Sequence, residues 1–173
     1  ENLPSYDLFI SKYDSDGNPI WVVTGQAIYE DRGMDVAVDN LNNIYVCGQF
    51  SDTLTFAGQQ FNNNGYNTGF LAKLNPAGQI QWMNTLRAGL VLPYSLAINS
   101  GNEVIITGDF RGNLIHTTPG GQQTITNPHQ NRIFAIKVAS NGNQLWQQTL
   151  GSDNSLSARA VAVDAAKNVF ITG

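Results

Sequence analysis

The stretch YDSDGNPIW, at residues 13–21, has the residue types of a calcium-binding loop. Asp14, Asp16 and Asn18 alternate with other residues, and Gly17 stands where the chain must bend. Calcium takes six or more oxygen ligands, which paired carboxylates help to supply. The same residue types also form tight turns, because Asp and Asn side chains hydrogen-bond to nearby backbone N–H groups. A recurrence of the stretch elsewhere in the chain would decide between a metal site and a turn.

Few other residues have the types and spacing for chemistry. His116 and His129 stand thirteen positions apart and could contribute to a metal site, but no third ligand has a matching spacing, so we expect surface histidines. Asp153 follows Gly-Ser without the G-x-S-x-G motif of a nucleophile elbow. Cys47, the single cysteine, has no base nearby in sequence, and we expect a small buried apolar residue. We therefore assign no catalytic residue, no metal ligand and no cofactor, and we expect a protein that is not an enzyme.

An internal repeat resolves the calcium question. The segments FISKYDSDGNPIWVVT, FLAKLNPAGQIQWMNT and FAIKVASNGNQLWQQT share Phe, Lys, Gly, Trp and Thr at one spacing. Between them recur DVAVDNLNNIYVCG, SLAINSGNEVIITG and AVAVDAAKNVFITG, with a period of 60 to 65 residues. Two of the three copies lack the paired carboxylates, while all three keep the Gly of the turn. The opening stretch is therefore predicted to be a hairpin turn.

Each repeat predicts four short strands. Segments such as DVAVD, NIYVCGQF, GFLAKLN and QIQWMNTL are rich in residues that favour strands and are separated by polar turns. Their apolar residues occur on both faces, so each sheet must be covered by other sheets. Radial stacking of four-stranded antiparallel sheets is a β-propeller, and we predict this all-β fold. A two-sheet sandwich is the alternative.

The repeat boundaries predict one partial propeller domain over residues 1–173. It contains a half blade at 7–24, blades at 34–86 and 94–150, and a half blade at 158–173. Closed propellers use about four to eight blades, so three cannot easily close. Either the chain belongs to a longer propeller, or two copies associate into six blades. We favour the longer propeller, because a strand motif that stops short leaves an edge that proteins normally protect.

A polar insertion lies between the second and third strands of each full repeat. Leu54 and Leu114 match within it, and Leu54, Phe56 and Phe61 are expected to form a small extra hairpin. Variable loops on a repeated scaffold commonly form binding surfaces. Asn-rich turns with Tyr66 could suit a sugar, and plain connecting loops are the alternative. No ligand-binding residue is assigned.

Two further sets of residues recur with the repeat. Lys12, Lys73 and Lys137 fall in strands that we expect to be covered on both faces. A buried ammonium is costly unless paired, so each should reach the rim or meet a carboxylate or a carbonyl. The Asp or Asn that follows each first strand, as at Asp39, is expected to form an Asx turn.

The composition excludes some functions. The net charge is -4 and no basic cluster occurs, which disfavours nucleic-acid binding. No apolar run approaches the roughly 20 residues of a membrane span, so we expect no membrane insertion.

The segment AVD…NIYVCG, followed by GFLAKLNPAGQIQW, resembles the bacterial β-propeller repeats called SBBP. The resemblance covers nearly the whole chain in three copies. It implies an exported protein like those of Bacteroidetes, extracellular or at the outer-membrane surface of a Gram-negative bacterium, often secreted through the type IX pathway. It implies no single activity. We expect a binding or scaffold module for protein or glycan partners, for other blades of a longer chain, or for a second copy.

The AGQIQW portion is also similar to the quinoprotein propeller repeat, in which a Gly precedes a Trp that packs between blades. The usual Thr-Gly dipeptide is replaced here by Asp16-Gly17, Ala77-Gly78 and Asn141-Gly142, so a quinone cofactor is not expected. Two alternatives to a binding module remain open. One is a propeller enzyme, quinoprotein-like or active on polysaccharide, and the other is an architectural spacer in an adhesin or filament.

Overall fold

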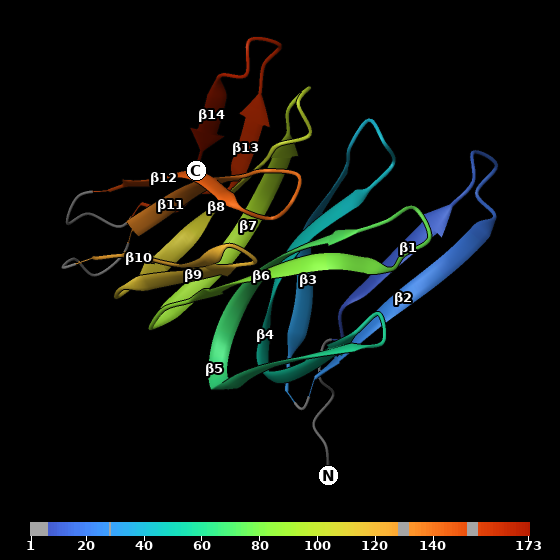
Figure 1. Cartoon of the computed structure of the whole chain (residues 1–173), viewed down its shortest axis with the longest axis horizontal. Coiled ribbons are helices and arrows are strands. Elements are labelled where there is room, and N and C mark those ends of the chain that lie inside the picture. The colour runs from blue at the N-terminus through green and yellow to red at the C-terminus, as the bar shows by residue number, and fades with distance from the viewer. Residues whose placement is uncertain (1–6, 28, 128–131, 152–155) are drawn as a thin grey trace.

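A computed structural model describes residues 7–27, 29–127, 132–151 and 156–173, and for residues 64–66 it describes the backbone alone. Within these ranges the chain is all-β, with antiparallel strands and no helix (Figure 1). The strands are β1 (Phe9–Tyr13), β2 (Pro19–Ala27), β3 (Asp31–Val38), β4 (Ile44–Phe56), β5 (Gln59–Leu74), β6 (Ile80–Arg87), β7 (Leu90–Ile98), β8 (Val104–Arg111), β9 (Leu114–Thr118), β10 (Gly121–Ile125), β11 (Arg132–Val138), β12 (Gln144–Leu150), β13 (Ala160–Val163) and β14 (Val169–Thr172).

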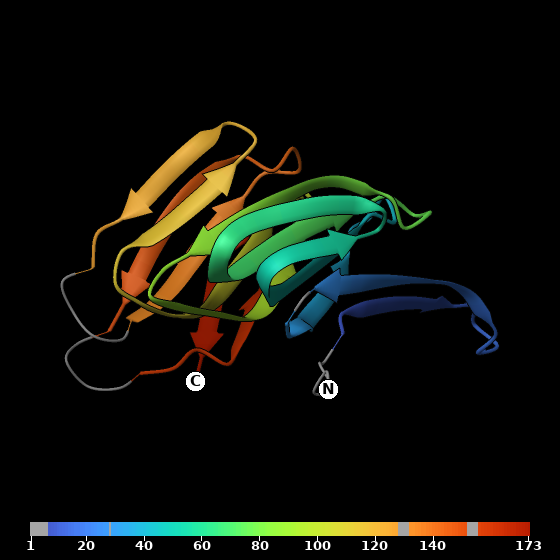
Figure 2. The same cartoon turned by 90° about the horizontal axis from the view of Figure 1, so that it is seen from below.

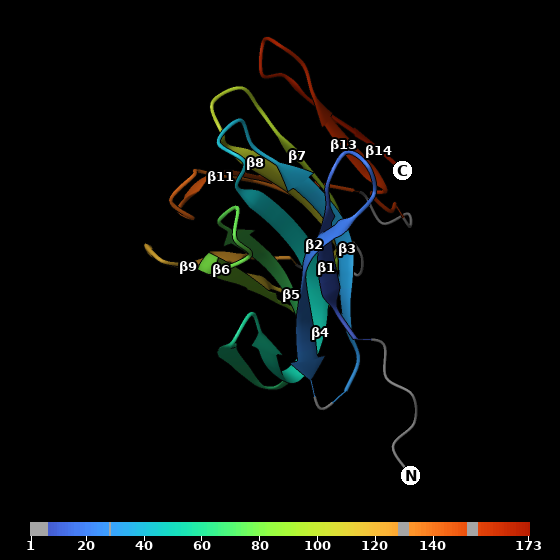
Figure 3. The ribbon, with the colours of Figure 1, turned by 90° about the vertical axis from the view of Figure 1, so that its right-hand side faces the viewer.

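The sequence repeat sets the order of the sheets. The first full repeat supplies β3, β4, β5 and β6, and the second supplies β7, β8, β11 and β12. The second repeat is a four-stranded sheet, while the first is joined to β2 and β9 in an eight-stranded sheet. Figure 2 shows these sheets following one another from β1–β2 (blue) to the second repeat (yellow to orange). The first strands β3, β7 and β13 contact one another in turn (Figure 3).

Two buried apolar clusters fill the spaces between successive repeats. Alternation along each strand sends neighbouring side chains to opposite faces, so one sheet contributes to both clusters. Val46 and Phe70 pack toward β1 and β2, together with Leu8 and Ile10. From the other face of the same sheet, Tyr45, Cys47, Leu71 and Leu86 pack toward the second repeat. The expectation of strands that are apolar on both faces is confirmed.

The glycine that recurs within each second strand, or directly after it at Gly173, has no room for a side chain. Gly48, Gly108 and Gly173 occupy this place, and a Cβ on them would lie 1.6–2.1 Å from a carbonyl oxygen of the first strand or of the segment just before it. In the two full repeats that carbonyl lies beside a shift in the strand register. The Gly recurs because two backbones approach closely there.

The repeated Trp of one repeat contacts a turn of the next. Trp21 Nε1 donates to Pro76 O at 3.3 Å, and Trp82 Nε1 donates to Ser140 O at 3.1 Å. Both carbonyls lie in the turn between the third and fourth strands. The Gly of that turn has positive φ, and a Cβ on Gly142 would lie 3.0 Å from the Trp82 ring. The Gly therefore serves both the turn and the contact between repeats.

Each insertion forms a hairpin that pairs with the preceding repeat. We call these the insertion hairpins, at residues 51–67 and 114–125. In the first hairpin, Leu54 pairs with Phe61, and the β4 segment that carries Leu54 also pairs with β2. In the second hairpin, β9 pairs with both β10 and β6. The two hairpins pair with the preceding repeat in the same register. Phe56 of the first hairpin pairs with Gly25, and His116 of the second pairs with Leu86, which stands at the same position of the repeat as Gly25. The expected extra hairpin is confirmed, and it ties successive sheets together.

Two of the three repeated lysines have the expected partners. Lys73 Nζ donates to Ser140 O at 3.1 Å, which is a carbonyl of the next repeat. Lys137 Nζ forms an ion pair with Glu103 Oε2 at 2.5 Å. Lys12 is half-buried on β1, and its pairing stays a prediction.

Candidate functional site

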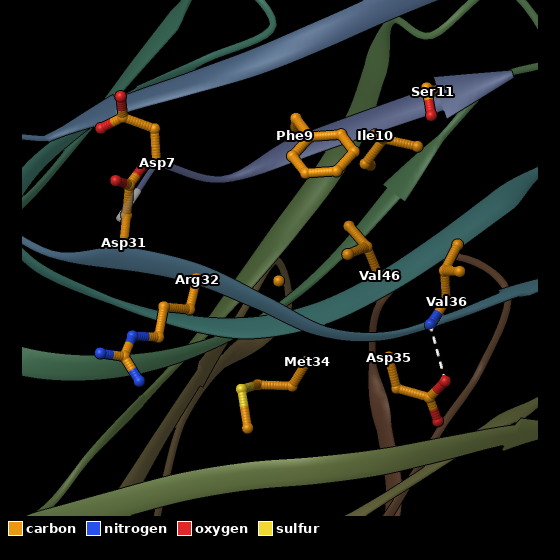
Figure 4. A pocket seen from close by; sticks show the side chains of 11 residues that line it. Asp7, Phe9, Ile10, Ser11, Asp31, Arg32, Met34, Asp35, Val36 and Val46 are labelled. Carbon is orange, nitrogen blue, oxygen red and sulfur yellow. Dashed lines mark hydrogen bonds between the residues drawn. The ribbon is translucent and has the colours of Figure 1, made fainter. Parts of the chain in front are cut away.

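A cavity of about 530 Å³ lies between β1 and β3 (Figure 4). Its middle is apolar, with Ile10 from β1 and Val46 from β4. Asp7, Asp31 and Arg32 lie together at one end (Figure 4). The cavity therefore combines an apolar interior with a charged rim.

Two strand edges border this cavity. Among the described strands, β1 pairs with β2 alone and β3 pairs with β4 alone. Phe9 and Val36 line the cavity and expose 65% and 54% of their surface. Edge strands offer unpaired N–H and C=O groups, so the cavity suits another β-strand better than a small polar molecule. Nowhere in the described ranges do three or more potential metal-ligating side chains come together.

Asp31 is a buried carboxylate at the charged end. Its side chain is 0% exposed, and within the described residues neither oxygen has a hydrogen bond of normal geometry. Burial is the main cause that raises the pKa of Asp31; the charge of Asp7 adds to this, and the backbone of Leu8 partly opposes it. Asp31 pairs with Phe50 of β4, and Val91 pairs with Phe110 of β8 in the second repeat. Val91 is therefore the equivalent of Asp31, and it is buried. Asp31 thus occupies an apolar position of the repeat.

We expect Asp31→Val to stabilise the protein by roughly 1–3 kcal/mol at pH 7, because it removes a buried charged group that is poorly paired. The raised pKa means that this cost is present above the folded-state pKa. It shrinks as pH falls through the folded-state pKa and is gone below the unfolded-state value of 3.8, where the carboxyl is protonated in both states. Urea unfolding of both proteins at pH 7 and at pH near 4 measures the difference. A variant less stable than the parent at pH 7 would contradict the interpretation.

His116 lies in a buried polar cluster between the two full repeats. It is 1% exposed; its Nδ1 donates to Gln144 Oε1 at 2.6 Å, and its Nε2 accepts from Asn84 Nδ2 at 3.2 Å. Asn84 Nδ2 also donates to Gly142 O at 2.9 Å. Burial lowers the pKa of His116, so the imidazole is neutral. The expectation of a surface histidine is wrong here, because the insertion hairpin places this side chain against β6.

The same contact is apolar one repeat earlier. Val23, Phe56 and Ile80 stand at the positions of Asn84, His116 and Gln144, and they belong to the cluster that packs against β1 and β2. The polar cluster is therefore a variation of a packing contact between repeats. No sequence motif announces it, although the alignment of Phe56 with His116 places the histidine at a buried position.

We expect the free energy of unfolding to fall as pH drops below about 6.5, since the unfolded chain binds the His116 proton more readily than the folded chain does. The loss levels off once pH is below the lowered folded-state pKa. The triple variant Asn84→Val, His116→Phe and Gln144→Ile copies the apolar contact and should flatten this dependence. Urea unfolding between pH 5 and 8 compares the two proteins. Equal pH dependence in both would rule out His116 as the cause.

The calcium-like stretch is a turn, as expected. Asp14 Oδ1 accepts from the backbone N–H groups of Asp16 at 2.9 Å and Asn18 at 2.8 Å, and Oδ2 accepts from Asn18 Nδ2 at 2.9 Å. These hydrogen bonds, chiefly those from Asn18, lower the pKa of Asp14. Gly17 has a φ of +84°. The carboxylate is thus occupied by its own turn.

The turn after each first strand is built in the same way. Asp39 Oδ1 accepts from the N–H groups of Leu41 and Asn43, and Asp164 Oδ1 accepts from that of Asn168. The Asx-turn interpretation is confirmed for these positions.

The remaining candidates have separate outcomes. Cys47 is buried in an apolar cluster, and burial raises the pKa of its thiol, so its expected packing role is confirmed. His129, Asp153 and the side chain of Tyr66 lie outside the described residues.

No protein-family model matches the chain. An uncharacterized WD repeat-containing protein of Acanthamoeba polyphaga mimivirus is 27% identical over 120 residues, which cover 61% of this chain and 9% of that protein. The chain therefore spans about a tenth of that relative's length. The all-β structure and this similarity together indicate a β-propeller-like repeat module. The described residues form no helix that is long and apolar enough to cross a membrane.

Proposed function

We propose that this chain is a noncatalytic propeller module of an exported protein, at the outer-membrane surface of a Gram-negative bacterium or outside it. It serves there as a binding or scaffold domain for a protein or glycan partner. The repeated all-β structure and the WD repeat-containing relative support the propeller-like part. The resemblance of NIYVCG and GFLAKLNPAGQIQW to SBBP repeats supports export, with the type IX pathway as the proposed route.

We interpret each full repeat as one four-stranded blade. In the second repeat the sheet order is β7-β8-β11-β12, from first strand to last. The first strands of successive repeats contact one another, as strands along a propeller axis do. The repeated Trp donates to the turn of the next repeat at both Pro76 O and Ser140 O. This recurrence supports the same packing geometry between successive sheets.

The cavity between β1 and β3 is the observation that carries the binding role. Its strand edges require backbone partners, and its exposed Phe9 and Val36 favour apolar ones. A polypeptide that adds a strand satisfies both requirements. A glycan presents hydroxyl groups and sugar ring faces, and the lining offers it Phe9 as an exposed aromatic ring. We therefore place a protein partner ahead of a glycan.

Antibody labelling of intact cells tests the location. We expect an antibody against this chain to label intact cells of the organism that encodes it. Labelling that requires permeabilised cells would overturn the exported location.

Binding is tested with the purified chain on a glycan array and with a protein partner isolated from the cell envelope. Met34→Asp puts a charge into the cavity, and Leu41→Asp puts the same charge at an exposed turn. We expect the partner to bind the parent and the Leu41 variant but not the Met34 variant. Equal binding by all three proteins would exclude the cavity, and turnover of a polysaccharide by the purified chain would overturn the noncatalytic role.

A further inference from the structure

The cavity between β1 and β3 has a charged end that its apolar interior does not explain. The carboxyl groups of Asp7 and Asp31 lie side by side there (Figure 4). We propose that the polypeptide partner of this cavity carries a Lys or Arg side chain, whose cationic group pairs with the carboxylate of Asp31. The inference rests on the proposed function, because it states the chemistry of the partner that binds at the same site.

The carboxylate of Asp31 is buried without a partner of opposite charge among the described residues. Its side chain is 0% exposed, and neither oxygen has a hydrogen bond of normal geometry. A carboxylate that is removed from water is costly unless a cation or several hydrogen-bond donors compensate for the loss. A cation that arrives with the partner strand would supply this compensation.

Asp7 makes the same end of the cavity more negative. After burial, the charge of Asp7 is a further cause that raises the pKa of Asp31, so the two carboxylates lie close enough to repel each other. A basic side chain placed beside both groups reduces this repulsion and also pairs with Asp31. The charged end is therefore complementary to a cation.

Arg32 follows Asp31 directly in the chain but does not supply this cation. Successive residues of a strand point to opposite faces, and Figure 4 shows the Arg32 guanidinium and the Asp31 carboxylate on opposite sides of β3. Arg32 Nη2 instead forms an ion pair with Glu30 Oε2 at 2.9 Å. The charge of Asp31 is thus not neutralised from its own strand.

The second repeat shows that the fold itself does not need a carboxylate at this position. Val91 stands there in the second repeat, is 1% exposed and belongs to an apolar cluster. An aliphatic side chain therefore satisfies the packing, whereas Asp31 brings a cost without a packing benefit. Departures from the residue that stability favours are expected at functional sites. Partner recognition accounts for Asp31, and packing does not.

The place of Asp31 sets the order of residues in the partner strand. Asp31 lies at one end of the cavity, and Ile10, Val46 and Val36 lie farther along it (Figure 4). Alternate residues of a strand point to the same side. The partner segment should therefore have a basic residue followed or preceded by apolar residues at every second position.

The test uses a fluorescent peptide that alternates Val with Thr and has Lys in place of its central Val, together with matched peptides that have Gln or Glu there. Anisotropy measures their binding to the 173-residue chain at pH 7. The Lys peptide should bind at least about tenfold more tightly than the Gln peptide, and the Glu peptide should bind most weakly. Asp31→Asn keeps the size of the side chain, removes its charge and should abolish the preference for Lys. Asp16→Asn removes the same charge at an exposed turn and should leave the preference unchanged.

A carboxyl-carbon NMR titration measures the contact itself. The bound Lys peptide should lower the pKa of Asp31, because a nearby cation favours the charged carboxylate. The bound Gln peptide should not lower this pKa. If Asp31 had only a packing role, the Lys and Gln peptides would have the same effect on its titration.

Equal binding of the Lys and Gln peptides by the parent would overturn the inference, as would a preference for Lys that survives Asp31→Asn. Failure of all three peptides to bind would overturn it as well. Circular dichroism shows whether each variant keeps its strands. Gln peptide that binds the parent but not Met34→Asp would still support a strand-binding cavity, so failure of this inference is distinguishable from failure of the proposed function.

Discussion

Replacing Gly108 by Ala is expected to cost more than about 3 kcal/mol of unfolding free energy and to reduce the yield of folded protein sharply. A Cβ at this position would lie 2.1 Å from Leu92 O and 2.8 Å from Pro93 Cα. Both atoms belong to the backbone of β7, so no side chain can rotate away to make room. The β7–β8 ladder must separate instead, and the second repeat loses its first strand from the sheet.

Gly58→Ala is the matched control for this change. Gly58 has a φ of +77°, but a Cβ there would have nothing within 4 Å. Its replacement should therefore cost only the strain of a left-handed conformation, about 1–2 kcal/mol. Urea unfolding of the three proteins measures the difference, and equal costs at the two glycines would show that the strands do not approach as closely as described.

The second large effect is expected at Leu86. Leu86→Ala should lower the unfolding free energy by roughly 2–5 kcal/mol, because the side chain is 0% exposed and its loss leaves a cavity in the cluster between the repeats. The second insertion hairpin covers Leu86, because its strand β9 pairs with β6 at this residue.

Leu150 provides the comparison, because it stands at the same place in the second repeat and is 50% exposed. Among the described residues no insertion hairpin pairs with β12. Leu150→Ala should therefore cost less than about 1 kcal/mol. The difference between the two variants in denaturant unfolding measures what the hairpin contributes. Similar losses at both positions would mean that the hairpin stabilises the sheet very little.

Much of the fold follows from the spacing of a few residues. The Phe, Lys, Gly and Trp pattern predicts the third and fourth strands and the turn between them, and the structure has all three where expected. The positive φ of Gly17, Gly78 and Gly142 follows from the same pattern, because a short hairpin turn needs it. Local spacing is enough here, since a turn and its two strands lie close together in sequence.

The residues of the candidate site are harder to predict from the sequence than the strands and turns are. Asp31 carries no motif, and its burial depends on strands that pack around it from elsewhere in the chain. The sequence places His116 in a polar insertion and predicts a surface position, whereas β9 pairs with β6 across about thirty residues of sequence and buries the side chain. The cavity between β1 and β3 involves two strand edges, which no periodicity within one strand reveals.

The sequence by itself determined the repeat, the strand content, the turn residues and the absence of a disulfide within the chain, because each depends on residue type and short spacing. Only the tertiary structure decided which faces stay exposed, where the insertion hairpins pair, and why Gly48 and Gly108 recur. Those features depend on the distance between backbones that are far apart in sequence. The repeat pattern indicates that equivalent contacts recur, and the structure shows which atoms make them.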